Sequence, residues 1–233
     1  MLLAGLAALF AAGGCIPYAT GTTALPTPQG EVVPATSIYF IPGGVERLSA
    51  DSTGGSSFGI DLEARFGLDG RSDLGVRAPG LLGIVVNYKR RIDRRLDEDG
   101  PAVAWMLGAG VVNAGEHAHV EASLLTSGRQ SDDGAGFTPY GGIKAMHVFP
   151  LVPEAVRDDP TLGAFAGIRI GTAALAVSPE IAVFYDRSAL QLRDRNWIIV
   201  PSFTFHGDNL VRALFGGRPD TRPPPGYPPR PWP

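Results

Sequence analysis

The chain has 233 residues, and its 31 glycines and 21 prolines make up 52 of them, about 22% against a usual background near 12%. Charged residues are 18% and the net charge is −3. This composition excludes a coiled coil, a long helical bundle or a charged disordered chain. It gives no basic stripe for nucleic acid. One cysteine excludes a zinc framework and an internal disulfide.

The chain opens with a short apolar run, residues 1–14, which ends in small residues. It is too short for a membrane helix, which needs about 20 apolar residues, and is predicted to be a signal peptide. Its end, Ala12-Gly13-Gly14-Cys15, resembles the lipobox of bacterial lipoproteins. The resemblance implies lipid attachment at Cys15, and Ile16 in place of Asp after it favours the outer membrane. An ordinary signal peptide beside a free cysteine is the alternative. No Lys or Arg precedes the run, so whether Met1 is the true start stays open.

Two segments flank the predicted folded domain. Residues 15–29 are rich in Thr and Pro and carry no charge, which indicates a lipid-anchored tether. Residues 208–233 form the tail, with 8 prolines in its last 18 residues. Proline lacks the amide donor of helices and central strands, so we expect a disordered, polyproline-type tail. A docking peptide for a periplasmic partner is the other interpretation.

Between these segments, short runs alternate apolar and polar residues. In residues 58–66 the even positions are Phe, Ile, Leu, Ala and Phe, whereas the odd positions are Gly, Asp, Glu and Arg. This period of two is that of a strand with one apolar face. Residues 68–73 follow as a turn with an Asp-Gly pair. Residues 30–207 are therefore predicted to be all-β, with about ten strands near 31–41, 58–66, 73–78, 82–92, 102–111, 117–125, 137–149, 162–171, 175–186 and 197–206.

Three features indicate that the apolar face points outward to lipid. The other face is rich in Gly and Ala, which suits a narrow lumen. Aromatic residues lie towards strand ends, as in the girdles of membrane barrels; they are Tyr39, Phe40, Phe58, Phe66, Tyr88, Phe149, Tyr185, Trp197, Phe203 and Phe205. Charges of both signs, which can pair in a confined interior, share the small-residue face. The predicted lumen charges are Asp61, Glu63, Arg65, Arg77, Lys89, Glu121, Lys144, Arg169 and Glu180.

The hairpin IDLEARFGLDGRSDLGVRAPG and the run LGIVVNYKRRI resemble segments of bacterial outer-membrane β-barrel proteins, as do TPYGGIKAMHVF and VSPEIAVFY. The resemblance implies a closed antiparallel transmembrane β-barrel of about 10 strands (8–12) in the outer membrane. Its partners would be outer-membrane lipid and the barrel-assembly and lipoprotein-sorting machinery. An even strand number would place both the lipid and the tail on the periplasmic side. Prolines in or beside strands, at Pro34, Pro79, Pro139, Pro179 and Pro201, would favour a sandwich if several were mid-strand.

Two clusters suggest chemistry. Glu116, His117 and His119 could begin a metal site, but no third ligand stands at a known spacing. His119, Glu121 and Ser123 share a strand face, as a base, an orienting carboxylate and a nucleophile would. Alternation produces such trios by chance, and no nucleophile elbow surrounds Ser123. We therefore predict no catalytic residue, metal or cofactor.

The predicted function is a non-catalytic envelope role, either structural or in small-molecule binding or permeation. Side chains nearly fill a barrel of eight to ten strands, which favours a lumen plugged by salt bridges over an open pore. One alternative is a soluble periplasmic β-barrel lipoprotein that binds an apolar ligand inside. Another is a lipid-acting hydrolase that uses Ser123.

Overall fold

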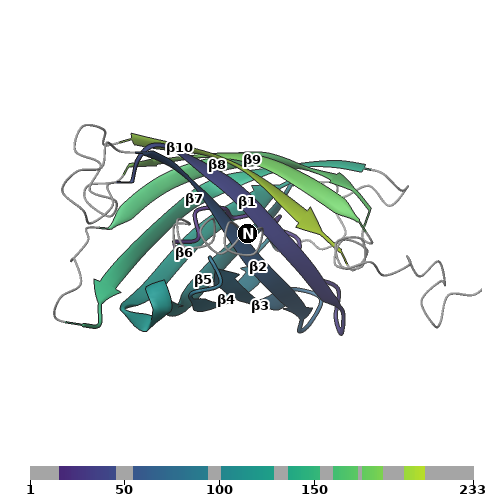
Figure 1. The fold of residues 1–233 in the computed structure, drawn as a ribbon. Coiled ribbons are helices and arrows are strands. Elements are labelled where there is room, and N and C mark those ends of the chain that lie inside the picture. Colours follow the sequence, from purple (N-terminus) through teal and green to yellow (C-terminus); the bar gives the residue numbers. More distant parts are fainter. Residues whose placement is uncertain are drawn as a thin grey trace, which may run out of the picture.

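The computed structural model describes residues 16–45, 55–93, 101–128, 136–152, 160–172, 175–185 and 197–207. This part of the chain contains ten strands and one short 3₁₀ turn, η1 (Asn113–Gly115) (Figure 1). The strands are β1 (Val32–Val45), β2 (Gly55–Gly67), β3 (Ser72–Pro79), β4 (Ile84–Arg91), β5 (Ala102–Val112), β6 (His117–Ser127), β7 (Gly136–Pro150), β8 (Thr161–Gly171), β9 (Ala176–Tyr185) and β10 (Trp197–His206). No helix among the described residues is long and apolar enough to cross a membrane.

Each strand pairs antiparallel with its neighbours in sequence, and β1 pairs with β10 to close the barrel. The prediction of a closed all-β antiparallel barrel of about ten strands is therefore confirmed. The closing ladder joins only Ala35–Tyr39 of β1 to Ser202–His206 of β10. At one end of the barrel, the near mouth, β1 begins at Val32 and β10 ends at His206. At the other end, the far mouth, β3 ends at Pro79 and β4 begins at Ile84.

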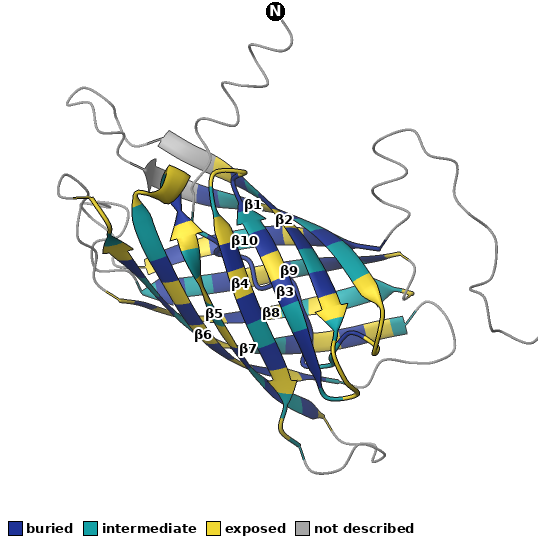
Figure 2. Cartoon of the chain, turned by 90° about the horizontal axis from the view of Figure 1, so that it is seen from below, coloured by how far each residue is buried: buried dark blue, intermediate teal, exposed yellow. Residues whose placement is uncertain are grey.

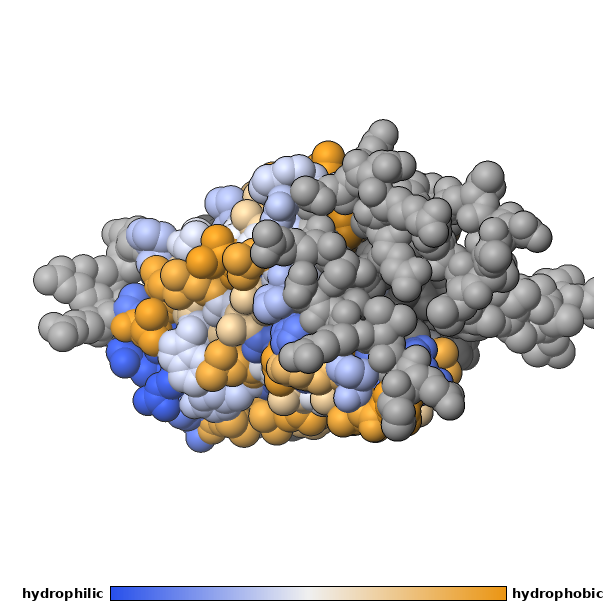
Figure 3. Space-filling model, turned by 90° about the vertical axis from the view of Figure 1, so that its left-hand side faces the viewer, coloured by the Kyte–Doolittle hydropathy of each residue, from blue (hydrophilic) through white to orange (hydrophobic). Residues whose placement is uncertain are grey.

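Burial alternates residue by residue along the strands, as Figure 2 shows. In β2, the side chains of Asp61, Glu63 and Arg65 are buried, whereas Phe58 and Leu62 are exposed. The same alternation exposes large apolar side chains around the barrel, and orange patches mark them on the face in Figure 3. The predicted direction of the faces is correct: the apolar face points outward and the charged face inward.

Outward aromatic side chains lie towards both mouths. Near the far mouth the rings of Phe40 and Phe58 are 4.9 Å apart, and those of Tyr185 and Trp197 are 5.1 Å apart. Towards the near mouth the rings of Tyr88 and Trp105 are 5.3 Å apart. Two such belts are what membrane barrels place at the two interfaces. Tyr39 is a correction to the predicted belt, because its position in β1 points it into the lumen, where it is 1% exposed.

Prolines lie inside paired strands without opening the barrel. Pro139 lies opposite Ile168, while Pro179 and Pro201 lie opposite Phe203 and Ile181 in the same β9–β10 ladder. Each proline removes a single donor, and the residues on either side of it stay in register. The expectation that several mid-strand prolines would favour a sandwich is therefore wrong.

The predicted turn between β2 and β3 is present at the near mouth. Oδ1 of Asp69 accepts a hydrogen bond from the Arg71 amide at 2.7 Å. This bond holds the pKa of Asp69 below its ordinary value. The turn thus has the side-chain to backbone bond that favours Asp at such positions.

Residues 16–27, here called the luminal segment, lie inside the barrel. Figure 1 shows them in purple, within the ring of strands. Residues 17–24 are all buried, although no strand or helix is formed there. The structure thus differs from the prediction of a tether at residues 15–29. The chain before β1 turns at Gly30, at the near mouth, and runs from there into the lumen.

Candidate functional site: the filled lumen

The predicted lumen charges point into the barrel from seven different strands. Eight of the nine are buried, and Arg169 is half-buried. The buried members are Asp61, Glu63, Arg65, Arg77, Lys89, Glu121, Lys144 and Glu180. A buried charge is costly unless it is paired and hydrogen-bonded. The partners of each group therefore decide what this lumen can do.

A connected network of ion pairs lines β2, β3 and β4. Arg65 bridges Glu63, at 2.6 Å between Nη1 and Oε1, and Asp73. Arg77 contacts Glu63 at 2.9 Å, and Lys89 contacts Asp73 at 3.2 Å. Each acid therefore faces two cations, which satisfies both carboxylate oxygens inside the barrel.

A second ion-paired group, smaller than this network, lies on β6 and β7. Nζ of Lys144 lies 2.9 Å from Oε2 of Glu121, and His119 Nε2 lies 3.5 Å from the same oxygen. The hydroxyl of Ser123 has no hydrogen-bond partner among the described residues. Four residues along one strand span about 13 Å, so Ser123 and His119 lie too far apart to share a proton. The trio does not form a catalytic triad.

Glu180 on β9 holds the luminal segment by its backbone. Its two carboxylate oxygens accept hydrogen bonds from the amides of Thr20, at 2.8 Å, and Gly21, at 3.0 Å. The hydroxyl of Tyr140 donates to the same carboxylate at 3.0 Å. No Lys or Arg of the described chain forms an ion pair with Glu180. Backbone N–H groups of the segment thus take the place of a cation.

Three cations of the lumen, Arg77, Lys89 and Lys144, bind carbonyls of the same segment. Arg77 donates to the carbonyls of Ala19 and Thr20, at 2.8 and 3.2 Å. Lys89 donates to the carbonyls of Thr23 and Leu25 and to the Thr22 hydroxyl. Further bonds join Lys144 to the Pro17 carbonyl, the Tyr39 hydroxyl to the Ile16 carbonyl, the Ala24 amide to Ser127, and the Thr27 amide to Asp73. The backbone of the segment therefore has hydrogen-bond partners along its length without joining the sheet.

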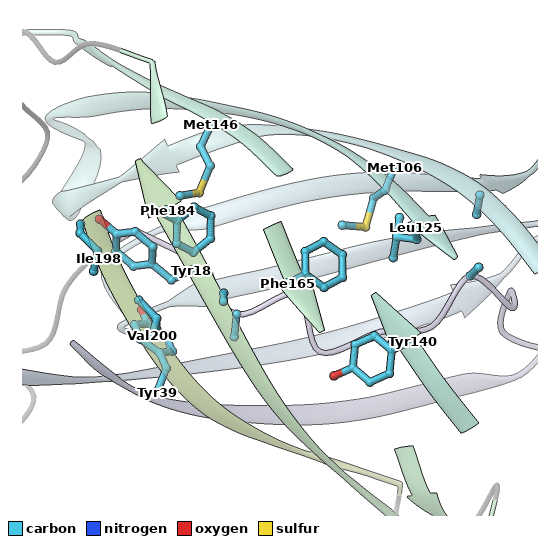
Figure 4. Close-up of a cluster of buried hydrophobic side chains, with 14 of the residues drawn as sticks. Tyr18, Tyr39, Met106, Leu125, Tyr140, Met146, Phe165, Phe184, Ile198 and Val200 are labelled. Carbon is cyan, nitrogen blue, oxygen red and sulfur yellow. The ribbon is translucent and has the colours of Figure 1, made fainter. Parts of the chain in front are cut away.

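Apolar side chains fill the space that the polar network leaves. Tyr18 of the luminal segment is fully buried, with its ring centroid 5.2 Å from that of Phe184 and 6.2 Å from that of Tyr39 (Figure 4). Ile16 packs against Val85, Val112 and Val148. Those three valines lie near the far-mouth ends of β4, β5 and β7. Ile16 is therefore at the far mouth, and the segment runs the length of the lumen from there to Gly30.

Inward glycines make room for three of the aromatic rings. A Cβ at Gly59 would meet the ring of Tyr39 at 2.1 Å. Gly163 faces Phe184, and Gly167 faces Tyr140, in the same way. Each glycine is the direct cross-strand partner of its aromatic residue. The glycine excess of the sequence thus lets large rings lie across the inner wall of a narrow barrel.

The described lumen is balanced in charge. Five basic side chains (Arg65, Arg77, Lys89, Lys144 and Arg169) face five acidic ones (Asp61, Glu63, Asp73, Glu121 and Glu180). The luminal segment adds none, because Glu31 is the first charged residue of the chain. An uncharged segment adds no charge that would need a partner in such an interior.

Two parts of this site are absent from the sequence-based prediction. Asp73 is fully buried at the centre of the first network. Its alternation in phase with Arg77 is the signal that could have placed it in the lumen. The luminal segment is the other part, and it has no apolar periodicity. Its lack of charge over residues 16–30 is the available signal.

The remaining predicted groups contribute no site in the described chain. Glu116 lies at the barrel rim, hydrogen-bonded to Asn113. The described residues contain no group of three metal-binding side chains. Cys15 and the tail at 208–233 lie outside the described residues.

No known family and no curated protein matches this sequence. Among solved structures, the chain is similar to Ail, the attachment invasion locus protein of Yersinia pestis, in complex with the heparin analogue sucrose octasulfate. That match has 9% identity and a TM-score of 0.28, over 76% of this chain and 96% of that chain. A second structure of Ail matches with 11% identity and a TM-score of 0.23, over the same shares of both chains. The fold assignment rests on the barrel's own topology: it is an all-β, closed, antiparallel barrel of ten strands in the described chain.

Proposed function

We propose that this protein is an integral outer-membrane β-barrel that its own luminal segment keeps closed, and that its role in the envelope is non-catalytic. In the resting state it acts as a sealed membrane scaffold. Ions or small molecules pass only when the luminal segment leaves. This proposal joins the two roles expected from the sequence, structural and permeation, as two states of one barrel.

The hydrogen bonding of the luminal segment carries the proposal. Glu180, Arg77, Lys89 and Lys144 each bond to its backbone, and all four are among the charges that would otherwise line a pore. The segment thus occupies the space through which hydrated ions would have to pass, and we expect it to block them. Removal of the segment would leave cations and an acid facing water, as in a conducting channel.

Membrane placement is supported by the outward face. Exposed Leu62, Ile84 and Leu124 belong to strands whose opposite faces carry buried polar or charged side chains. A soluble lipocalin-like barrel has the reverse pattern, with the apolar face inside. The alternative of a soluble periplasmic lipoprotein with an apolar ligand is therefore less well supported. The separation of Ser123 from His119 likewise removes the main support for a hydrolase.

The remaining parts of the proposal rest on sequence resemblance. They are lipid attachment at Cys15, delivery by the lipoprotein-sorting and barrel-assembly machinery, and contact with outer-membrane lipid. A periplasmic partner for the tail rests instead on its proline-rich composition. We expect the near mouth, where both barrel termini lie, to face the periplasm, as in bacterial barrels of even strand number.

Planar-bilayer recordings test the closed state. We expect the purified full-length protein to show rare openings, and a variant lacking residues 16–27 to show frequent, stepwise conductance. Residues 28–31 stay in this variant, because the amide of Gly30 bonds to the Gly67 carbonyl and anchors the start of β1.

A matched control lacks residues 208–233 instead, and it should behave like the full-length protein. Equal conductance of the full-length protein and the variant without residues 16–27 would overturn the proposal. Silence of both proteins would contradict the permeation state and leave a purely structural barrel.

A further inference from the structure

The described chain passes through its own barrel, so that its first described residue, Ile16, and its last, Gly207, lie at opposite mouths. At the near mouth, the amide of Gly207 bonds to the Pro34 carbonyl, directly after β10. At the far mouth, Ile16 packs against Val85, Val112 and Val148. The luminal segment joins these two ends of the barrel. The segment thus begins, at Ile16, at the mouth opposite the one where Gly207 lies.

We infer that this protein displays the N-terminal end of its mature chain on the outer surface of the cell, while its C-terminal tail stays in the periplasm. The inference rests on the proposed function, which places the near mouth in the periplasm. If Cys15 carries the lipid, its acyl chains then enter the outer leaflet at the far mouth. The barrel would thus expose the N-terminal end of its own mature chain at its outer mouth.

The contacts of the luminal segment show that it runs once along the lumen, from the far mouth at Ile16 to the near mouth at Thr27. Its contacts follow the barrel in order: Thr27 with Asp73 near the near mouth, Thr20 with Glu180 midway, and Ile16 with the valines at the far mouth. A segment that folded back on itself would bring residues distant in sequence to one level of the barrel. The observed order is that of a single extended pass.

The short closing ladder between β1 and β10 explains how such a chain can be assembled. A lipid-modified end is too bulky to be pushed through a finished barrel whose lumen is packed with side chains. The β1–β10 ladder covers only Ala35–Tyr39 and Ser202–His206, and β1 directly follows the segment. The strands can therefore close around a segment that is already in place, with the short β1–β10 ladder forming last.

An accessibility experiment in cells tests the inference. One tagged variant carries an epitope between Cys15 and Ile16, and its matched partner carries the same epitope directly after Gly207. Antibody binding is measured on intact cells and on permeabilised cells. We expect the first tag to be bound on intact cells to most of its permeabilised level, and the second only after permeabilisation.

Each other pattern overturns the inference. Two tags that both need permeabilisation, or two that are both bound on intact cells, show that the ends share a mouth. A reversed pattern shows that the far mouth faces the periplasm. The mobility of unheated and heated samples is recorded for both tagged variants, since a folded barrel migrates faster unheated. Loss of that shift identifies failure of the proposed barrel. A retained shift with two tags of equal accessibility identifies failure of the threading alone, and a retained shift with the reversed pattern identifies failure of the proposed orientation.

Discussion

At the residue scale, the luminal segment depends on Gly21, where the barrel wall leaves no room for a Cβ. Gly21 has φ +60°, a left-handed backbone that costs other residues about 1–2 kcal/mol. A Cβ there would also meet Oγ1 of Thr204 at 2.4 Å. Gly30 has φ +77° as well, but its Cβ would meet nothing within 4 Å. A substitution at Gly30 therefore introduces backbone strain alone, whereas one at Gly21 also introduces a clash with the barrel wall.

We predict that Gly21→Ala destabilises the folded barrel more than Gly30→Ala. Both substitutions add the left-handed strain, but only the first forces the segment against Thr204, at a further cost of about 1–3 kcal/mol. Urea unfolding in detergent micelles measures the difference. Equal losses of stability would show that the segment does not pack against β10 as described.

Glu180 offers a second test at this scale, because its carboxylate binds two amides of the luminal segment. Hydrogen bonds to charged groups contribute about 1.5–3 kcal/mol each. Glu180→Ala should therefore weaken the closed state by about 3 kcal/mol, which is roughly a hundredfold rise in the ratio of open to closed states. Single-channel recordings measure that ratio.

Glu31→Ala is the matched control for Glu180→Ala. Its side chain is exposed just outside the lumen, so the variant loses the same charge without losing a bond to the segment. We expect it to open no more often than the wild-type protein. If the two variants open equally often, the effect is one of charge and not of segment binding.

At the element scale, the strands could be predicted and the luminal segment could not. Apolar and polar residues alternate because the two faces of each strand meet different environments. The side-chain types of neighbours such as Asp61 and Leu62 therefore indicate which one points inward. The segment has a single environment on all sides, and its bonds use backbone atoms that every sequence has. Pro17, Pro26 and the threonines around them are equally typical of an exposed linker. Only the partners on distant strands, such as Glu180, place it inside.

The lumen contacts also limit what sequence could show about the site. The charged residues are visible as a face, but their pairing is not, because Arg65 and Asp73 meet only once β2 and β3 are in register. The position of Tyr39 beside Phe40 predicts a belt residue, and that prediction is wrong. The direction of Tyr39 follows from its register with Gly59, whose missing side chain accepts the ring.

An engineered disulfide tests the position of the segment as an element. The Ala24 amide lies 3.2 Å from Oγ of Ser127 on β6. In a variant with Cys15 replaced by Ser, the pair Ala24→Cys and Ser127→Cys should form a disulfide on oxidation. After denaturation, neither cysteine should then react with maleimide. The disulfide should also abolish channel openings. Dithiothreitol should restore the wild-type openings.

The control for the disulfide is Ala24→Cys with Thr126→Cys. Thr126 is the adjacent residue, but its side chain is exposed on the outer face of β6. This pair should keep both thiols free under the same oxidation. Equal oxidation of the two pairs would show that residue 24 does not face the inner wall at Ser127.

At the scale of the whole molecule, composition and architecture agree. The low content of charge follows from strands that are apolar on their outward face and line a crowded lumen on the other. The glycine excess follows in part from rings laid across the inner wall at Gly59, Gly163 and Gly167. The uncharged luminal segment fills the space inside the ten strands and bonds to the polar side chains that line it.

The most direct test of this account is the state of the protein in the membrane. Outer membranes are extracted with carbonate, and the retained protein is run on a gel with and without heating. An integral closed barrel stays in the membrane fraction and migrates faster unheated than heated. Release by carbonate, together with one mobility in both samples, would contradict the outward apolar face and the membrane-spanning barrel built on it.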